Sequence, residues 1–320
     1  MRVCLMIEGQ EGVSWGTWVA LAEACERLGF EALFRSDHYL SVDGHGDRGS
    51  LDAWATVCGL GAVTQEVRLG TLVSPATFRH PSVLAKNVVS ADHISGGRVE
   101  LGLGTGWLED EHTAYGFPFP PLGERMEILG EQLEIVRRSW AAGAFDFTGA
   151  HYRVERLDAR PKPVQRPHPR LLVGGSAGPR SAALAARWAD EYNTLYVTPE
   201  RARERRSTLD RACEGAGRDP ATLHLSMMNA FLIGADRDDL RARAQRLADW
   251  RGDADQARGD VDAYIGALDP WIVGAPEEFV DRLREYEAAG IERVMLQHHL
   301  FEDFDALELI GREVIPALAT

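Results

Sequence analysis

The sequence contains few cysteines, only four among 320 residues, and no two of them form a CxxC pair. Their wide spacing is typical of free thiols and not of a disulfide framework. We interpret Cys4, Cys25, Cys58 and Cys213 as buried thiols of a protein kept in a reducing compartment. This interpretation favours a cytoplasmic location.

Long hydrophobic runs are also missing. The apolar run at the N-terminus stops before Glu8, so we expect a strand there and not a signal peptide. No segment approaches the roughly 18 apolar residues that a membrane span needs. Basic residues number 35 against 49 acidic ones, which gives a formal net charge of −14. A protein of this charge repels nucleic-acid phosphates and anionic membranes, so we expect neither as a partner.

Several common catalytic signatures are absent from the chain. The first predicted βα turn, at residues 8–12, does not fit the GxGxxG pattern of dinucleotide-binding folds. There is no GxSxG elbow for a serine nucleophile. There is no HxH in the first predicted strand, and the adjacent His298 and His299 would point apart on a strand, so metal ligation is disfavoured.

Strand and helix patterns alternate along the whole sequence. Eight segments have the character of strands, and helical patterns separate them, which favours a parallel sheet closed into a (β/α)₈ TIM barrel. An open, doubly wound α/β sheet is the alternative. We predict one domain over residues 1–320, with insertions near 145–169 and 251–270. The predicted strands are 3–7, 31–37, 67–73, the start of 98–107, 170–173, 191–195, 222–233 and 291–297.

The segment 98–107, RVELGLGTGW, is the most distinctive of these. Bulky apolar residues alternate with Glu100, Gly102 and Gly104, so one face of the strand is nearly bare. A bare face lets a flat ligand or another backbone come close. We therefore predict a cofactor pocket at the carboxyl end of this strand.

A second glycine-rich turn, GGSAGPR at 174–180, follows a predicted strand and opens a helix. The backbone N–H groups of Gly174 and Gly175 and the helix N-terminus can receive an anion there. Ser176 could add a hydroxyl donor and Arg180 a guanidinium. An ordinary tight turn is the alternative, but the late position in a barrel favours phosphate binding.

Two further segments could contact a ligand. Ser36, Asp37 and His38 end the second predicted strand, where Asp37 could brace the backbone or the loop. His38 could donate to a cofactor or act as a general acid or base. A surface histidine before a loop is the alternative. Segment 72–81 leaves the third strand without glycine and could form either an apolar shelf under an aromatic ring or a structural loop.

Taken together, these segments resemble the bacterial-luciferase-like superfamily, and more narrowly its branch that uses the deazaflavin coenzyme F420. The similarity spans almost the whole chain and is least secure in the middle insertion. The matching segments are 36–38, 72–81, 94–107, 117–125, 174–176 and 271–278.

The resemblance implies a cofactor ring over the carboxyl end of the barrel, with a non-prolyl cis peptide at Leu72–Val73 behind it. It implies His38 as the catalytic residue near the reacting carbon. The cofactor contacts that it implies are Asp37, Leu72, Val73, Thr105, Gly106, Gly174, Gly175, Ser176 and Arg180. Sugar-phosphate dehydrogenases of this branch carry a catalytic glutamate after the Thr-Gly pair, whereas this chain has Trp107. We predict Trp107 as an aromatic wall of the substrate pocket, with Glu109 nearby.

The resemblance implies hydride transfer between F420 and a small organic substrate. An FMN-dependent monooxygenase is one alternative, and a non-catalytic flavin- or deazaflavin-binding barrel is another. We expect a homodimer and a separate F420 or flavin reductase that supplies reduced cofactor. The segments 38–50, 107–122 and 251–270 would form pocket walls or a mobile lid.

Overall fold

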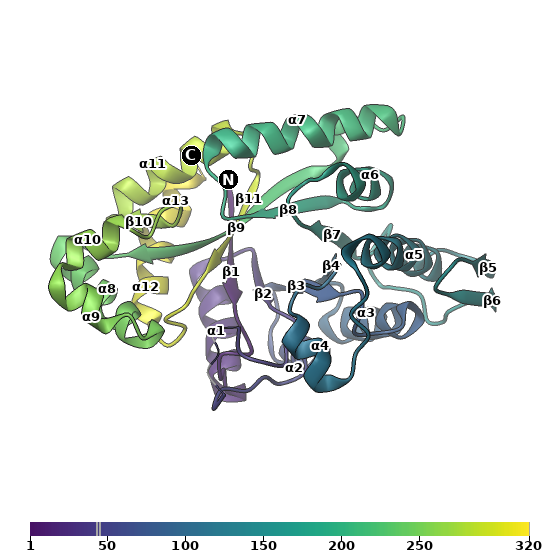
Figure 1. Ribbon diagram of the computed structural model, residues 1–320, viewed down its shortest axis with the longest axis horizontal. Coiled ribbons are helices and arrows are strands. Elements are labelled where there is room, and N and C mark those ends of the chain that lie inside the picture. Colours follow the sequence, from purple (N-terminus) through teal and green to yellow (C-terminus); the bar gives the residue numbers. More distant parts are fainter. Residues whose placement is uncertain (43, 45, 320) are drawn as a thin grey trace.

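Eight parallel strands close into a barrel in the computed structural model, which describes residues 1–42, 44 and 46–319 (Figure 1). The strands follow one another around the barrel in chain order, and the last pairs with the first. This confirms the predicted TIM barrel and excludes the open, doubly wound sheet. The barrel strands are β1 (Arg2–Ile7), β2 (Ala32–Arg35), β3 (Arg68–Pro75), β4 (Val99–Gly104), β7 (Arg170–Gly174), β8 (Glu191–Leu195), β9 (His224–Ile233) and β11 (Arg293–Gln297).

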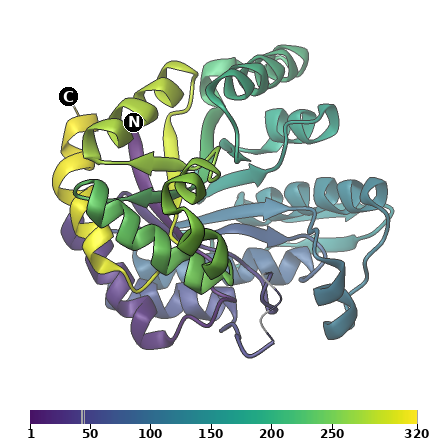
Figure 2. The same ribbon diagram turned by 60° about the vertical axis from the view of Figure 1, so that its left-hand side comes forward.

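Helices connect these strands and cover the outside of the barrel (Figure 2). Their ends carry the local signals that the sequence contains: Gly29 ends the first helix in the left-handed conformation, and Pro81 opens the third helix. The helices are α1 (Trp15–Leu28), α2 (Ala53–Val63), α3 (Pro81–Ser95), α4 (Glu109–Tyr115), α5 (Leu122–Trp140), α6 (Pro179–Trp188), α7 (Pro199–Gly215), α8 (Arg237–Arg251), α11 (Pro276–Ala288), α12 (Phe304–Leu309) and α13 (Ile315–Leu318). Within the described ranges, no helix combines the length and the apolar character needed to cross a bilayer.

The two segments predicted as insertions add structure outside the barrel. Strands β5 (Phe145–Thr148) and β6 (Arg153–Leu157) form an antiparallel hairpin beyond α5 (Figure 1). Helices α9 (Ala254–Gly259) and α10 (Val261–Gly266) pack with α8 around a small apolar cluster of their own. A short strand, β10 (Ile272–Gly274), then pairs with β9 outside the barrel.

Charged side chains fill the amino-terminal end of the barrel interior. The guanidinium of Arg293 lies 2.7 Å from Glu100, 3.2 Å from Glu191 and 2.7 Å from Glu31. The side chains of Arg293, Glu100 and Glu191 are fully buried, so each charge depends on its partners. Apolar residues of the barrel strands pack above this cluster, among them Phe34 and Met295. The interior is therefore closed below, and the carboxyl end of the strands is left for a site.

Candidate functional site

A cavity of about 540 Å³ opens at the carboxyl end of the barrel strands. Its volume lies within the range of about 300–1,000 Å³ that is usual for small-molecule and cofactor sites. Most of the residues predicted for the site line it. These are His38, Leu72, Val73, Thr105, Gly106, Trp107, Gly174 and Gly175. Asp37, Glu109, Ser176 and Arg180 do not belong to the lining.

The back wall of the cavity is a bulge in β3. The peptide bond between Leu72 and Val73 is cis, as the family resemblance implied, and the pairing of β3 with β4 shifts register at this point. A Cβ atom on Gly104 would lie 2.7 Å from Val73 Cγ2, and one on Gly174 would lie 3.0 Å from Val73 Cγ1. A Cβ on Gly102 would lie 2.2 Å from the carbonyl oxygen of Thr71. The bare face of β4 therefore makes room for the neighbouring strand, which presents Val73 as an apolar shelf.

His38 lies at the edge of the cavity with one ring nitrogen fixed. Its Nδ1 is 2.8 Å from Oε2 of Glu111, whose side chain is completely buried. Glu111 also accepts hydrogen bonds from the backbone N–H groups of Tyr39 and Leu40. Because an ionised carboxylate can only accept, His38 donates from Nδ1, and Nε2 is the nitrogen left open to the cavity.

The pair also changes the protonation of both partners. Burial alone would lower the pKa of His38, but the hydrogen bond and the charge of Glu111 outweigh it and raise that pKa above its usual value. Burial opposes ionisation of Glu111, and the hydrogen bond from His38 overcomes this, so the pKa of Glu111 is lowered. The arrangement holds a proton on an imidazole beside a mostly apolar cavity, as a general acid requires.

Glu111 is a site residue that our sequence analysis missed. It belongs to the first turn of α4, which also contains Glu109 and Asp110. Residues 109 and 111 point to different sides of a helix, so the exposed Glu109 and the buried Glu111 have different surroundings. The helical start at Glu109 was the one signal that could have separated these two carboxylates.

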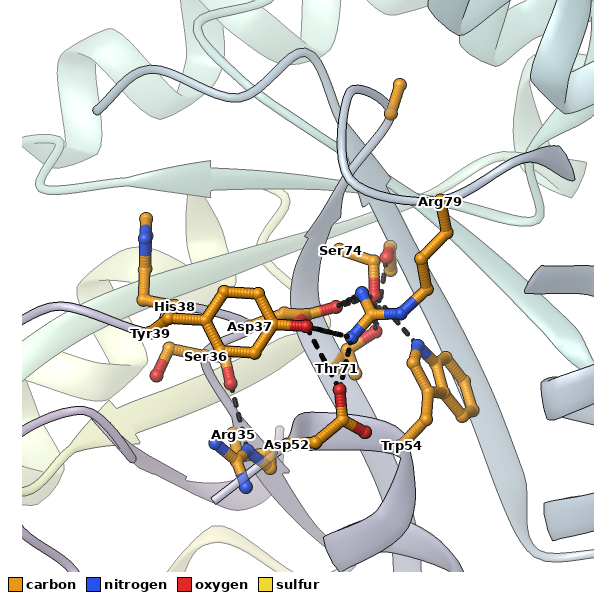
Figure 3. Close-up of polar contacts among 12 residues, drawn as sticks. Arg35, Ser36, Asp37, His38, Tyr39, Asp52, Trp54, Thr71, Ser74 and Arg79 are labelled. Carbon is orange, nitrogen blue, oxygen red and sulfur yellow. Dashed lines mark hydrogen bonds and ion pairs between the residues drawn. The ribbon is translucent and has the colours of Figure 1, made fainter. Parts of the chain in front are cut away.

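Asp37 points away from the cavity into a polar network behind β2. Its carboxylate accepts hydrogen bonds from Ser74 Oγ at 2.6 Å and from Arg79 Nη1 at 2.6 Å (Figure 3). Arg79 also reaches Asp52 at 2.8 Å and the hydroxyl of Tyr39 at 3.0 Å. This network ties the end of β2 to the loop after β3, so Asp37 supports the segment that carries the catalytic candidate.

The glycine turn after β7 reaches the cavity through Gly174 and Gly175 only. Ser176 and Arg180 are exposed, and Arg180 lies 3.5 Å from Glu127. The hydroxyl of Tyr192 holds the turn by accepting from the backbone N–H of Ala177 at 2.7 Å. Helix α6 begins directly after the turn, and no side chain caps its N-terminus. An anion placed there would meet the positive end of the helix dipole.

Trp107 forms the outer wall beside His38. The indole is 62% exposed, and its ring lies edge-on to the imidazole with centroids 5.7 Å apart. The guanidinium of Arg125 donates to the carbonyl of Gly106 and lies 3.9 Å from the ring centroid of Phe119, which fixes the loop that follows.

The cavity has a polar corner that our sequence analysis did not predict. Glu8 lies there, and its two carboxylate oxygens accept from Gln297 Nε2 at 2.6 Å and from Gln10 Nε2 at 2.8 Å. His299 lines the same side. Among the described residues that form the lining, none is a lysine or an arginine.

Comparisons with known proteins agree with this geometry. Residues 3–293 match the family model of luciferase-like monooxygenases. An F420-dependent hydroxymycolic acid dehydrogenase of Mycobacterium tuberculosis is 32% identical over 238 residues, which cover 73% of this chain and 62% of that protein. An FMNH(2)-dependent dimethylsulfone monooxygenase of Pseudomonas putida is 26% identical over 323 residues, with coverage of 92% and 86%.

A similar architecture is found among solved structures. An F420-dependent secondary alcohol dehydrogenase, solved with an F420-acetone adduct, superposes with a TM-score of 0.82. The match covers 99% of this chain and 98% of that one at 20% identity, so it supports the fold.

Proposed function

The chain belongs to the luciferase-like monooxygenase family, and on that premise we propose that it is an oxidoreductase that uses coenzyme F420. In this proposal a hydride moves between the deazaflavin ring and a small organic substrate. The observation that carries it is His38, whose Nε2 is open to the cavity while Glu111 holds Nδ1. The 32% identity to the F420-dependent relative, over 73% of this chain, supports the choice of deazaflavin.

The residues present fit a ring with a phosphate tail. The Val73 shelf would support the ring from behind, and Thr105 and Gly106 would line its edge. Gly174, Gly175 and the uncapped N-terminus of α6 would receive the phosphate. When bound, F420 supplies a carbon centre that gives or takes a hydride, while the protein contributes position and surroundings.

The residues of the chain have separate tasks in this proposal. His38 delivers a proton from Nε2 to the substrate oxygen during reduction, or removes one during oxidation. Glu111 keeps the imidazole in one orientation and favours its protonated form. Trp107 packs edge-on against His38 and forms an aromatic wall for the substrate.

Binding titrations of the purified protein with F420 and with FMN, each oxidised and reduced, test the cofactor. We expect F420 to bind and FMN to bind weakly. His38→Ala should keep F420 affinity within a few-fold and lower turnover on a panel of alcohols and ketones by about 100-fold or more. His93→Ala, an exposed histidine on α3, is the matched control. Tight FMN binding without F420 binding would reject the proposal.

A second candidate function is an FMN-dependent monooxygenase, which the relative from Pseudomonas putida supports. Oxygen consumption that depends on reduced FMN and on a substrate would identify it. A third is a non-catalytic cofactor-binding barrel. F420 binding without turnover, unchanged by His38→Ala, would favour that one.

We also propose that the protein is a cytoplasmic homodimer and receives reduced cofactor from a separate F420 or flavin reductase. The free state of all four cysteines supports a reducing compartment. Sedimentation velocity at micromolar concentration tests the dimer, and a single species of monomer mass would contradict it.

A further inference from the structure

His299 lies across the cavity mouth from the glycine-rich edge. It follows β11, and β11 is the fourth strand from β4 in either direction around the eight-stranded barrel. A ring supported by β3, β4 and β7 would therefore leave the β11 side free for a second molecule. His299 also lines an adjoining cavity of about 260 Å³, which it shares with Trp250 and Leu300.

The imidazole of His299 is held by aromatic rings and not by hydrogen bonds. Trp271 stacks on it with centroids 4.9 Å apart and planes at 6°, and Trp250 meets it at 5.5 Å and 64°. Its Nε2 is buried without a hydrogen-bond partner. A buried polar nitrogen without a partner is costly, and a ligand that supplies one would remove that cost.

The wall around His299 is built from three distant segments of the chain. Arg48 lies 4.5 Å from the ring centroid of Trp250 and donates to its carbonyl at 3.3 Å. Arg48 also pairs with the buried Glu11 at 2.9 Å. The loop after β2, the end of α8 and the loop after β11 thus meet here. Residues 43 and 45 of the predicted pocket-wall segment 38–50 lie outside the described residues.

The arginines near His299 are paired with carboxylates and are therefore not free to receive an anionic ligand. Arg48 lies 2.9 Å from Glu11, Arg246 lies 2.7 Å from Asp303, and Arg251 lies 3.3 Å from Asp253. Glu8 is the one carboxylate of the described lining, and both its oxygens already accept amide hydrogen bonds. Burial, helped by the charges of Arg251 and His298, lowers the pKa of His299 to about 3, so it is neutral at pH 7. A neutral imidazole offers one donor and one acceptor. The remaining wall is largely apolar and includes Val42, Leu195 and Met228.

We propose that His299 binds the substrate, and that the substrate is an uncharged organic molecule with an apolar body and a hydrogen-bonding oxygen. This inference rests on the proposed function, because it assigns the opposite side of the cavity to the cofactor. His299 acts as a specificity residue: it pairs with a carbonyl or hydroxyl oxygen, and the tryptophan-lined wall accepts the apolar body.

Three small probes of one shape test the inference by binding alone. Cyclohexanone, cyclohexanecarboxylate and cyclohexylammonium are titrated into the protein, without and with F420, and followed by tryptophan fluorescence and calorimetry. We expect the ketone to bind at least tenfold more tightly than either ion. Equal or tighter binding of the carboxylate or the ammonium would overturn the assignment of an uncharged substrate.

Variants of His299 test the residue itself. His299→Phe keeps an aromatic ring between the two tryptophans but cannot hydrogen-bond, and we expect it to weaken ketone binding about tenfold or more. His299→Gln retains a donor and an acceptor and should stay within about threefold of the wild type. His93→Phe, on the exposed face of α3, is the control. Unchanged ketone binding by His299→Phe would overturn the role of His299.

The cofactor titration separates this inference from the proposed function. If His299→Phe binds F420 as the wild type does but loses the ketone, both proposals stand. If the wild type binds no F420 yet binds the ketone through His299, the proposed function fails and the substrate contact stands. If F420 binds and the ketone binds equally well to the wild type and to His299→Phe, the inference alone fails.

Discussion

Replacing Glu111 by glutamine should lower the pKa of His38. Glutamine keeps the shape of the side chain and can still accept from a backbone N–H, but it removes the negative charge that favours the imidazolium. A hydrogen bond to a charged partner contributes about 1.5–3 kcal/mol. About 1.4 kcal/mol corresponds to one pKa unit. Because the side chain of His38 is only 12% exposed, solvent screens little of this interaction. We therefore expect the loss of this free energy to appear as a lower pKa of His38 in Glu111→Gln.

Proton NMR of the His38 ring, titrated in the wild type and in Glu111→Gln, measures this change directly. In the variant the burial of His38 still disfavours its charged form, and only the charges of Glu8 and Asp37 oppose it, so the pKa of His38 should fall below that of the wild type. Glu109→Gln, on the exposed side of the same helix turn, should leave it unchanged. An equal pKa in the wild type and in Glu111→Gln would refute the assignment of Glu111 as the residue that holds the proton on His38.

The same pair predicts how stability depends on pH. The pKa of His38 is raised in the folded protein, so the folded state binds its proton more tightly than the unfolded state does. Its contribution to the free energy of unfolding is full below the unfolded pKa, about 6.5, and is lost as pH rises through the raised value. Urea denaturation at pH 6 and pH 8 should show this loss in the wild type, and Glu111→Gln should abolish or reverse it. The same pH dependence in both proteins would contradict the prediction.

Three other substitutions test the frame of the site. Gly102→Ala should destabilise the protein by about 1–3 kcal/mol, because its Cβ would lie 2.2 Å from the Thr71 carbonyl oxygen. Gly16→Ala in α1 is the control, since its Cβ would make only an ordinary contact with Ser14 Oγ at 3.8 Å. Equal melting temperatures of Gly102→Ala and the wild type would contradict the packing. Arg293→Met should cost about 1.5–3 kcal/mol in urea denaturation, because Glu100 and Glu191 lose the cation that they share and keep only Arg68 and Arg170; unchanged stability would contradict a role of Arg293 in holding these carboxylates. Asp37→Asn should lower turnover more than F420 affinity, because it weakens the brace to Arg79 behind His38; a selective loss of F420 binding would instead make Asp37 a cofactor contact.

The strands of the barrel could be predicted from the sequence because each is a short apolar segment between turn signals. All eight predicted strands are present, with ends that differ by up to a few residues. β10 was not predicted as a strand, because a three-residue segment is too short to show a period. The glycines of β4 were correctly identified as a bare face, but the sequence left open whether a ligand or a backbone fills it. At Gly102 the backbone of Thr71 in the neighbouring strand β3 fills this space.

The site was predictable where a residue's role depends on its place along a strand. His38, Gly104 and Gly174 follow from strand ends and glycine turns, which are local features. Asp37 and Arg79 are 42 residues apart, and their ion pair follows only from the way β2 and β3 lie side by side. The environment of His299 likewise depends on contacts with distant parts of the chain. Such contacts are set by tertiary packing, and they cannot be predicted from the local patterns of a single sequence.

The ion cluster around Arg293 has a consequence for how molecules enter and leave the barrel. Since charged side chains fill the lower end, a ligand enters and departs through one opening. Ligands on the two opposite sides of the cavity share this one opening. Steady-state kinetics should therefore show that each bound ligand slows the exchange of the other.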